Sequence, residues 1–298
     1  MVAPVDVPHR RLLLVHAHPD DETITTGATM ARYAAEGVRV TLVTCTLGEQ
    51  GEVLVPDYAG LAADQADQLG GLRIGELSAA MRALGVRDHR FLGGAGRFRD
   101  SGMLGTSANL HPRAFWRADT DPQVFAAAVD AMVEVIREVR PQVVVTYDDR
   151  GDYGHPDHLM AHRVATAALA AAADPTRGPG QPWSVAKLYW TATPRSVLES
   201  DFVAVSGLDG GFVPADPDDL PFGVPDHVVT TTVDAEPFCA AKRAALAAHR
   251  TQITVAGGFF ALSNNLGRKI RGVEHYRLVA GGHVATAHET DLFDGVET

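Results

Sequence analysis

The sequence is poor in cysteine, in positive charge and in long apolar runs. Its 298 residues include two cysteines, Cys45 and Cys239, too few for a disulfide framework or a thiolate zinc cluster. No segment approaches the roughly 20 consecutive apolar residues that cross a membrane, and residues 1–11 lack the apolar core of a secretory signal. Lysine and arginine number 26 against 37 acidic residues, a net charge of −11, which disfavours a nucleic-acid-binding surface. We therefore expect a cytoplasmic protein without nucleic-acid or membrane partners.

The apolar pattern predicts strands that alternate with helices. Residues 11–17 and 38–45 read as buried strands, and a helix capped by Thr23 and ending near residue 36 lies between them. Such a unit places its two strands parallel. Further helices are predicted at residues 62–84, 124–139 and 158–173, and further strands at 88–92 and 143–147. The prediction is an α/β fold, a mostly parallel sheet flanked by helices.

The C-terminal part carries weaker signals. We expect strands at residues 187–192 and 227–233, a helix at 237–250 and an acidic loop at 209–226, and the pattern fades from about residue 283. The Gly- and Pro-rich stretch at 178–182 resembles a linker. We expect a core of residues 1–180 and a C-terminal extension of residues 181–298 packed on the same domain.

Two histidine-bearing loops follow predicted strands. His18-Pro-Asp-Asp21 comes after the first strand, and His155-Pro-Asp-His158 comes after the strand that ends at Tyr147. In an open parallel sheet, ligands bind outside the carboxyl ends of the strands. The two loops are therefore predicted to meet.

Histidine and aspartate in these loops suit a catalytic metal site. A catalytic zinc takes three N or O ligands and keeps one open position, and His18, Asp21 and His158 can supply such a set. We expect one Zn²⁺ per chain, although two histidines and one carboxylate also suit Fe²⁺. Asp20 would then be free as a general base and His155 as a general acid.

Several other polar residues are candidates for contact with a substrate or a metal, or for a purely structural role. Tyr153 can donate a hydrogen bond to a substrate oxygen, and Glu52, Arg73 and Asp100 lie in or near loops that can rim the site. His16 is read as a packed strand residue. His162, four residues after His158, is an alternative metal ligand. The first strand–helix turn lacks the G-x-G-x-x-G of a dinucleotide site, which disfavours a nucleotide-binding oxidoreductase.

Together, the two loops resemble the paired signature of the zinc-dependent N-acetylglucosaminyl deacetylases. Segments 44–49, 66–71, 92–97, 99–103 and 261–265 extend the resemblance over most of the chain, and they are most similar to the members that deacetylate GlcNAc-inositol in mycothiol biosynthesis. The resemblance implies a Rossmann-like sheet and a small pseudodisaccharide substrate. A homo-oligomer is compatible with it.

The resemblance also implies roles for individual residues. His18, Asp21 and His158 would bind zinc, with Asp20 as general base, His155 as general acid and Tyr153 at the carbonyl oxygen. Asp157 would orient a ligand or His155 from behind the site. The substrate would be held by residues at four further positions: Glu52, Arg73, Asp100 and Met103.

Two other functions remain open at this point. The related amidase of mycothiol S-conjugates shares both histidine loops but carries a lysine shortly after the first, where this chain has Thr23-Ile-Thr-Thr26. A non-catalytic, metal-stabilised sugar-binding module is the other alternative. It gives no reason for the spare carboxylate of Asp20.

Overall fold

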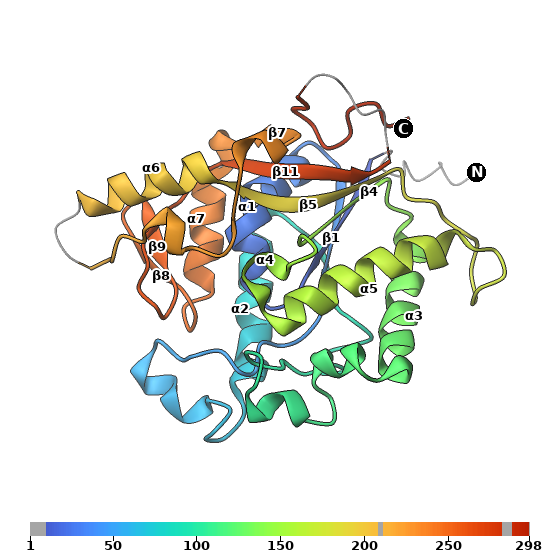
Figure 1. Ribbon diagram of the computed structural model, residues 1–298, viewed down its shortest axis with the longest axis horizontal. Coiled ribbons are helices and arrows are strands. Elements are labelled where there is room, and N and C mark those ends of the chain that lie inside the picture. Colours follow the sequence, from blue (N-terminus) through green and yellow to red (C-terminus); the bar gives the residue numbers. More distant parts are fainter. Residues whose placement is uncertain (1–9, 208–210, 282–287, 298) are drawn as a thin grey trace, which may run out of the picture.

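The computed structural model describes residues 10–207, 211–281 and 288–297. Within these residues the main sheet has eight strands, in the order β3-β2-β1-β4-β5-β11-β7, with β6 beside β5 (Figure 1). The strands are β1 (Arg11–His16), β2 (Arg39–Thr44), β3 (Asp88–Phe91), β4 (Val143–Thr146), β5 (Lys187–Pro194), β6 (Gly223–Val224), β7 (Thr231–Asp234) and β11 (Val273–Ala280). The five neighbouring strands β3, β2, β1, β4 and β5 run parallel to one another, and β11 is antiparallel to both β5 and β7. The predicted α/β fold is thereby confirmed.

Helices cover both faces of this sheet. Helices α1 (Asp21–Ala35), α2 (Leu69–Leu84) and α7 (Cys239–Ala248) pack on one face, and α3 (Pro122–Val139) and α5 (Pro156–Ala173) pack on the other. Two further helices are α4 (Gly151–Gly154) and α6 (Arg195–Ser206), and a small second sheet comprises β8 (Thr254–Ala256), β9 (Phe259–Ala261) and β10 (Arg268–Lys269).

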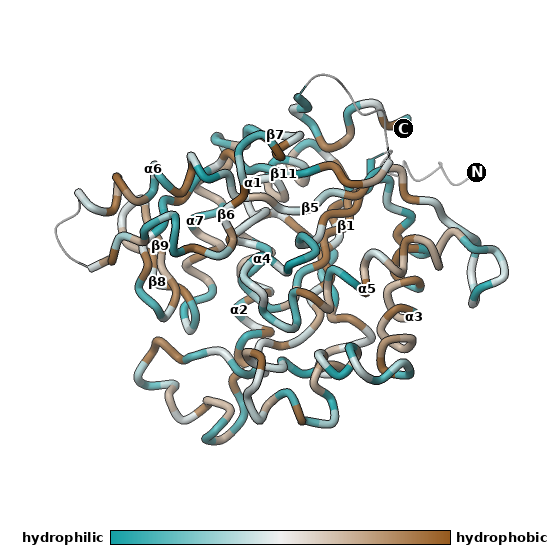
Figure 2. The backbone as a smooth tube through the Cα atoms, in the orientation of Figure 1, coloured by the Kyte–Doolittle hydropathy of each residue, from teal (hydrophilic) through white to brown (hydrophobic). Residues whose placement is uncertain are grey.

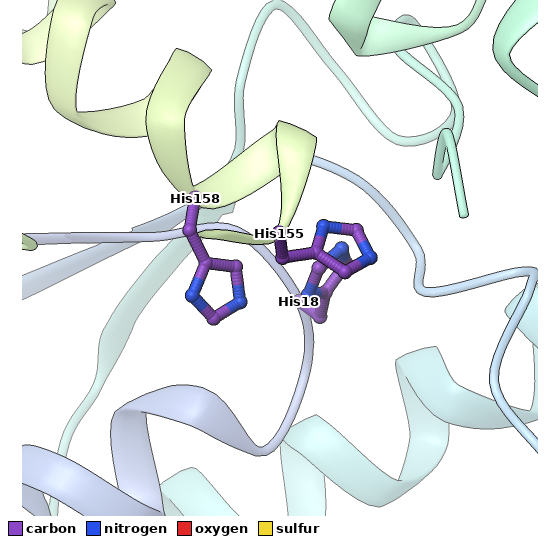
Figure 3. A group of neighbouring side chains, drawn as sticks. All are labelled: His18, His155 and His158. Carbon is purple, nitrogen blue, oxygen red and sulfur yellow. The ribbon is translucent and has the colours of Figure 1, made fainter. Parts of the chain in front are cut away.

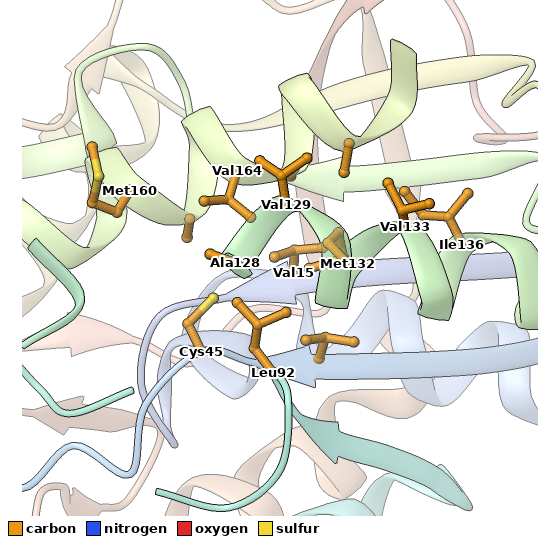
Figure 4. Packing of buried hydrophobic residues seen from close by; sticks show 14 of the residues in the cluster. Val15, Cys45, Leu92, Ala128, Val129, Met132, Val133, Ile136, Met160 and Val164 are labelled. Atoms are coloured by element: carbon orange, nitrogen blue, oxygen red, sulfur yellow. The ribbon is translucent and has the colours of Figure 1, made fainter. Parts of the chain in front are cut away.

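Successive side chains of β1 point to opposite faces of the sheet, and this explains why there is an apolar core on each face. Leu12 and Leu14 belong to the cluster under α1 and α2, whereas Leu13 and Val15 belong to the cluster under α3 and α5. Successive side chains of a strand point to opposite faces, so an unbroken apolar run is what a doubly covered strand needs. Figure 4 shows Val15 beside Val129 and Met132 of α3, and Figure 2 shows hydrophobic colour along β1 and α3.

Helix α3 has clear sequence signals for its apolar face and for both of its ends. Its apolar residues recur along one face, and the Asp121 carboxylate accepts hydrogen bonds from the backbone N–H of Gln123 and Val124. Pro122 occupies the first helical position, where no N–H is needed. Arg140, in the left-handed conformation with φ 56°, ends the helix before Pro141.

Several predicted helix starts were wrong, those of α3 and α7 by two residues each. Helix α1 begins at Asp21 rather than after Thr23, because the Asp20 carbonyl already accepts the N–H groups of Thr23 and Ile24. Helix α2 begins at Leu69 instead of residue 62, since Asp67 adopts a positive φ of 54° that interrupts the helical path. Helix α5 begins at Pro156 and so includes His158 in its first turn.

The C-terminal part was only partly predicted. The strand expected at 227–233 is short and begins at Thr231, while α6, β11 and the small sheet were missed. Residues 209 and 210 of the expected acidic loop, and residues 283–287 of the poorly patterned end, lie outside the described residues. The boundary expected near residue 180 stays a prediction, although β5, β11 and β7 extend the same sheet as β1.

Strands β1 and β4 are neighbours at the middle of the sheet. Leu12, Leu13 and Leu14 of β1 pair with Val143, Val144 and Val145 of β4 in parallel. The loops that follow these two strands therefore leave the same edge of the sheet side by side. Among the described residues, no helix has the length and apolar character needed to cross a membrane.

Candidate metal-dependent active site

Three histidines from the two loops meet at this edge of the sheet. His18 follows β1, and His155 and His158 come from the N-terminal end of α5 (Figure 3). The ring centroids of His18 and His155 are 4.6 Å apart, and those of His18 and His158 are 5.3 Å apart. One nitrogen from each of the three lies within 4.8 Å of the others, the spacing expected of groups able to share a metal ion.

Asp21 lies between two of these imidazoles. Its Oδ2 is 3.2 Å from Nδ1 of His18 and 3.3 Å from Nε2 of His158. The same oxygen accepts hydrogen bonds from the Tyr147 hydroxyl and from the His18 backbone N–H, at 2.8 and 2.9 Å. The side chain is thus fixed by groups that are not themselves candidate ligands, as the carboxylate of a metal site commonly is.

His158 supports a metal site most directly. Its side chain is 2% exposed, and in the described residues neither ring nitrogen has a hydrogen-bond partner of good geometry. Within the described residues, its Nε2 has the 3.3 Å contact with Asp21 but no well-aligned hydrogen bond. A buried imidazole so poorly hydrogen-bonded is costly, and a cation between His18, Asp21 and His158 would offset that cost. Two nitrogens and one oxygen suit a catalytic zinc, and they also suit Fe²⁺.

Two carboxylates, those of Asp157 and Asp100, lie near the Nε2 of His18. Its Nε2 is 3.2 Å from Oδ2 of Asp157 and 3.6 Å from Oδ1 of Asp100. Asp157 is fully buried and is itself held by the backbone N–H and the hydroxyl of Ser101. A carboxylate on the far nitrogen fixes the tautomer and the ring orientation of a metal-binding histidine.

Asp20 has an unusual backbone for a non-glycine residue. Its φ of 124° lies outside the regions that side chains favour, a strain on the order of 1–3 kcal/mol. The side chain is held by Arg73, whose Nη2 is 3.0 Å from Oδ2. Arg73 also donates to the carbonyls of Pro19 and Gly48. Gly48 has no Cβ, and a Cβ there would collide with the guanidinium.

The pKa values of the adjacent carboxyl groups of Asp20 and Asp21 are shifted in opposite directions. Burial raises the pKa of Asp20 to about 6, and the charge of Arg73 only partly offsets this effect. Burial also acts on Asp21, but the imidazoles of His158 and His18 outweigh it and hold the pKa of that carboxyl well below its usual value. Burial lowers the pKa of His18, yet the carboxylates of Asp100, Asp157 and Asp21 raise it well above its usual value. Asp20 is therefore suited to exchange a proton near neutral pH.

His155 lies at the start of α5 and caps it. Its Nδ1 accepts the backbone N–H of Asp157 at 3.1 Å, so Nε2 carries the proton of the neutral ring. Burial, together with the charges of His18 and His158, lowers the pKa of His155 to about 3. Tyr153, from α4, is 42% exposed, and its ring centroid is 4.9 Å from that of His158.

A cavity of about 660 Å³ opens over these groups. All but one of the side chains expected at the site line it, the exception being the fully buried Asp157. Met103 is half exposed at its rim. Arg73 lines the cavity as expected, and it donates hydrogen bonds to Asp20 and to backbone carbonyls.

Two other histidines lie outside the cluster. His16 is fully buried and contacts the hydroxyls of Tyr147 and Thr26. The Nδ1 of His162 is 3.1 Å from the backbone oxygen of Tyr147, and its ring packs against Trp190. Two groups of three side chains in the described residues bring their ligand atoms within 4.8 Å of one another, His18 with His155 and His158, and His18 with Asp100 and Asp157. Neither group contains His162 or Asp21, but Asp21, unlike His162, contacts the imidazoles of His18 and His158.

Sequence reasoning missed several residues of the site. Tyr147 stacks on His158 with ring centroids 4.2 Å apart, and its position at the end of a strand was the only signal. Asp152 lines the cavity, and burial raises its pKa to about 7. The opposite wall comes from the C-terminal part, through Phe202, Phe222, Leu262 and Arg268, and of these Leu262 alone belongs to a segment that carried the resemblance, residues 261–265.

The family to which the chain belongs follows from sequence comparison. A family model described as PIG-L: GlcNAc-PI de-N-acetylase matches residues 13–169, more than half of the chain. The chain belongs to the PIG-L family. The match includes both histidine loops and ends within α5, so the C-terminal wall of the cavity lies outside the matched residues.

Two relatives in the PIG-L family cover nearly the full length. One, from Geodermatophilus obscurus, is 62% identical over 97% of this chain and 99% of its own. The other, from Thermomonospora curvata, is 57% identical over 96% of this chain and 97% of its own. Both are named 1D-myo-inositol 2-acetamido-2-deoxy-alpha-D-glucopyranoside deacetylase.

Solved structures share the fold at much lower identity. The N,N'-diacetylchitobiose deacetylase of Pyrococcus horikoshii is 18% identical with a TM-score of 0.58, covering 95% of this chain and 88% of its own. GalB, the 4-carboxy-2-hydroxymuconate hydratase of Pseudomonas putida, is 18% identical with a TM-score of 0.55, covering 93% of this chain and 99% of its own. Because one of these is a deacetylase and the other a hydratase, the shared fold does not determine the reaction.

Proposed function

We propose that this protein is a metal-dependent deacetylase that hydrolyses the acetamide of 1D-myo-inositol 2-acetamido-2-deoxy-α-D-glucopyranoside, the reaction expected of mycothiol biosynthesis. The observation that carries the proposal is the position of the Asp21 carboxylate between His18 and His158, with the separate carboxylate of Asp20 beside it. The names of the relatives in Geodermatophilus obscurus and Thermomonospora curvata support the substrate.

The proposed metal ligands are His18, Asp21 and His158, with one ion per chain. Zinc is the cation we expect, and the same donors fit Fe²⁺. When bound, such a cation supplies a Lewis acid that polarises the acetamide carbonyl and makes a water molecule more acidic. Asp157 holds the far nitrogen of His18 and so keeps its other nitrogen directed toward Asp21.

Asp20 is proposed as the general base. Its pKa of about 6 leaves it largely ionised at neutral pH and able to accept a proton from the attacking water. The water oxygen bonds to the acetamide carbon, the carbon–nitrogen bond breaks, and acetate keeps that oxygen. Arg73 holds Asp20 in place through its Nη2, and this is the part we propose for Arg73 besides contact with the sugar.

His155 and Tyr153 are proposed to donate hydrogen bonds to the carbonyl oxygen of the acetamide, and His155 is also proposed to protonate its nitrogen. Because its pKa is lowered to about 3, His155 is neutral before the reaction and offers an Nε2–H to the developing oxyanion. Negative charge on that oxygen raises the pKa of a neighbouring imidazole. The proton that Asp20 removes from the water balances the one that the departing nitrogen gains, with His155 as the proposed general acid that delivers it, while Tyr153 donates a hydrogen bond to the oxygen.

The substrate hydroxyls are proposed to meet Glu52, Asp100 and the rim at Met103, all of which line the cavity. Its volume of about 660 Å³ is typical of small-molecule sites. We expect the reaction to take place in the cytoplasm, and sedimentation would show whether the protein forms a homo-oligomer.

Acetate release from GlcNAc-inositol tests the proposal. We expect release by the purified protein, loss of release with a chelator, and recovery when zinc is added back. A mycothiol–bimane conjugate, assayed in parallel, tests the related amidase activity. Faster cleavage of the conjugate would replace the proposed substrate, and no hydrolysis of either compound by metal-loaded protein would favour a sugar-binding module.

A further inference from the structure

Three consecutive acidic residues at the start of α1 are each paired with a different partner. Asp20 meets Arg73, Asp21 meets His18 and His158, and Glu22 meets His249. Buried carboxylates need such partners because burial without one is costly. The first two pairs join groups of the proposed active site, whereas the third reaches a histidine 227 residues away in the C-terminal part.

The Glu22 carboxylate connects that histidine with the proposed base. Its Oε2 accepts the backbone N–H of Asp20 at 2.9 Å, and its Oε1 accepts Nε2–H of His249 at 2.9 Å and the Thr23 hydroxyl at 2.5 Å. Glu22 and His249 are both fully buried. Neither lines the cavity, so neither is placed to touch a substrate there.

Asp20 needs such support because of its backbone. A φ of 124° is sparsely populated by residues with a side chain, and such a residue persists where its surroundings hold it. The Asp20 carbonyl is held by α1 and its carboxylate by Arg73. The Asp20 N–H donates to the Glu22 carboxylate, and that carboxylate is held in turn by His249 and by the Thr23 hydroxyl.

The residues that follow His249 fasten the neighbouring parts of the site. The Thr251 backbone N–H and hydroxyl both donate to Glu76 of α2, and Gln252 Nε2 donates to the carbonyl of Glu52. The stretch 249–252, which follows α7, is thus joined by side-chain hydrogen bonds to α1, α2 and the loop that carries Glu52. His249 therefore belongs to a segment that is hydrogen-bonded to three elements of the site and that lines the cavity through Gln252.

We infer that His249 is a positioning residue, which holds Asp20 in its productive orientation through Glu22. This inference rests on the proposed deacetylase function, because the orientation of Asp20 has a catalytic consequence only if Asp20 takes part in hydrolysis. Its structural half, the hold on the Asp20 backbone, does not depend on the reaction.

Two substitutions at position 249 separate positioning from simple packing. His249→Leu fills similar space but removes the donor to Glu22, whereas His249→Gln keeps an N–H that can reach the same carboxylate. We expect His249→Leu to lower kcat by about 10- to 100-fold, the loss that follows small displacements of reacting groups. KM and zinc content should stay near the wild-type values, since residues 18, 21 and 158 are untouched. His249→Gln should recover most of kcat.

Thr231→Val is the matched control. Thr231 is also a buried C-terminal residue with a hydrogen bond to a carboxylate, from its Oγ1 to Glu289 Oε2 at 2.7 Å. It lies in β7, at the far end of the sheet from β3, and removal of its hydroxyl should lower the melting temperature without changing kcat. An equal fall of kcat in Thr231→Val and His249→Leu would overturn the inference.

Amide hydrogen exchange tests the inference without relying on turnover. In His249→Leu we expect faster exchange at the Asp20 N–H, with unchanged exchange in residues 29–33 of α1. Unchanged exchange at Asp20 would overturn the positioning role even if kcat fell. If wild-type protein released no acetate, the proposed function would fail, while exchange would still decide whether His249 holds Asp20.

Glu22→Gln replaces His249→Leu if the latter does not fold. The amide offers one acceptor where the carboxylate serves both the Asp20 N–H and His249, so one of these hydrogen bonds is lost. We expect the same pattern of lower kcat, retained zinc and faster exchange at Asp20. Wild-type kcat and exchange in this variant would contradict the inference.

Discussion

The part of the chain up to the end of α5 and the part from β5 onward contribute to the site in different ways. The first supplies charged side chains from two compact motifs, each at the carboxyl end of a central parallel strand. The second supplies a largely apolar wall and buried hydrogen bonds from residues scattered between 193 and 268. The comparison teaches that the reacting groups and the groups that hold them follow different sequence rules. Chemistry needs particular residues at fixed spacing, whereas support needs only a contact that the fold brings about.

The largest effect is expected from removing a proposed metal ligand in the first part. His18→Ala should lose zinc and reduce acetate release to background, because two ligands do not complete a catalytic site. Metal analysis and an acetate assay measure both. His162→Ala is the control, since His162 contacts the Tyr147 carbonyl and should retain zinc. Loss of zinc in the control alone would move the ligand assignment to His162.

A smaller loss, without loss of metal, is expected from Asp20→Asn. The amide keeps the shape but cannot accept the proton, and general-base catalysis contributes about 10²- to 10⁴-fold. Zinc content and the melting temperature should remain close to wild type. Near-native kcat in a zinc-loaded Asp20→Asn enzyme would show that another group takes the proton.

An intermediate effect on metal affinity is expected from Asp157→Asn. This carboxylate holds the far nitrogen of His18, and losing such a partner costs about 10- to 100-fold in metal affinity or activity. Competition with a chelator measures the affinity. An unchanged zinc affinity would show that Asp157 supports only the Ser101 loop, to which it is also bonded.

The smallest effect on turnover is expected in the second part, at Glu289. This residue pairs with the buried Lys187 at 2.6 Å and accepts from Tyr189 and Thr231. Glu289→Gln should lower the free energy of unfolding at pH 7 by roughly 3 kcal/mol, because a buried cation loses its partner. It should leave kcat unchanged, and a large fall in kcat would show that this network supports the site.

The same carboxylate gives a pH dependence with a definite sign. Burial opposes ionisation of Glu289, but Lys187, Tyr189 and Thr231 outweigh it and lower its pKa. Its contribution to stability is therefore complete above the unfolded-state pKa of about 4.3 and is lost as the pH falls through the lower folded-state value. Denaturant melts between pH 6 and pH 3, in wild type and Glu289→Gln, should show a shallower decline for the variant.

The sequence predicted the first part better than the second for physical reasons. Strands β1 and β4 are covered on both faces, so they appear as uninterrupted apolar runs, and α3 has both a clear apolar face and a capping Asp-Pro pair. Strand β11 mixes buried Tyr276 with Arg277, and helix α6 begins after Pro194 without a side-chain cap, so neither gave a clear signal. Long-range pairing with β5 decides the course of β11.

The site divides along similar lines. Histidine and aspartate at fixed spacing indicated the cluster around His18, and the parallel neighbours β1 and β4 explain why it assembles. Tyr147 and His249 could not be assigned from local sequence. Their importance lies in contacts with Asp21 and Glu22 across 126 and 227 residues, and an apolar or Ala-rich neighbourhood gives no indication of such partners.

The family model ends within α5, yet one wall of the cavity is made of later residues. A substitution in that wall changes the surface that a substrate meets without altering the histidine loops that carry the proposed metal ligands. Homologues that share the catalytic motifs can in this way diverge in the molecules they accept. Transplanting the C-terminal wall between two such homologues should transfer substrate preference more effectively than exchanging any residue of the loops.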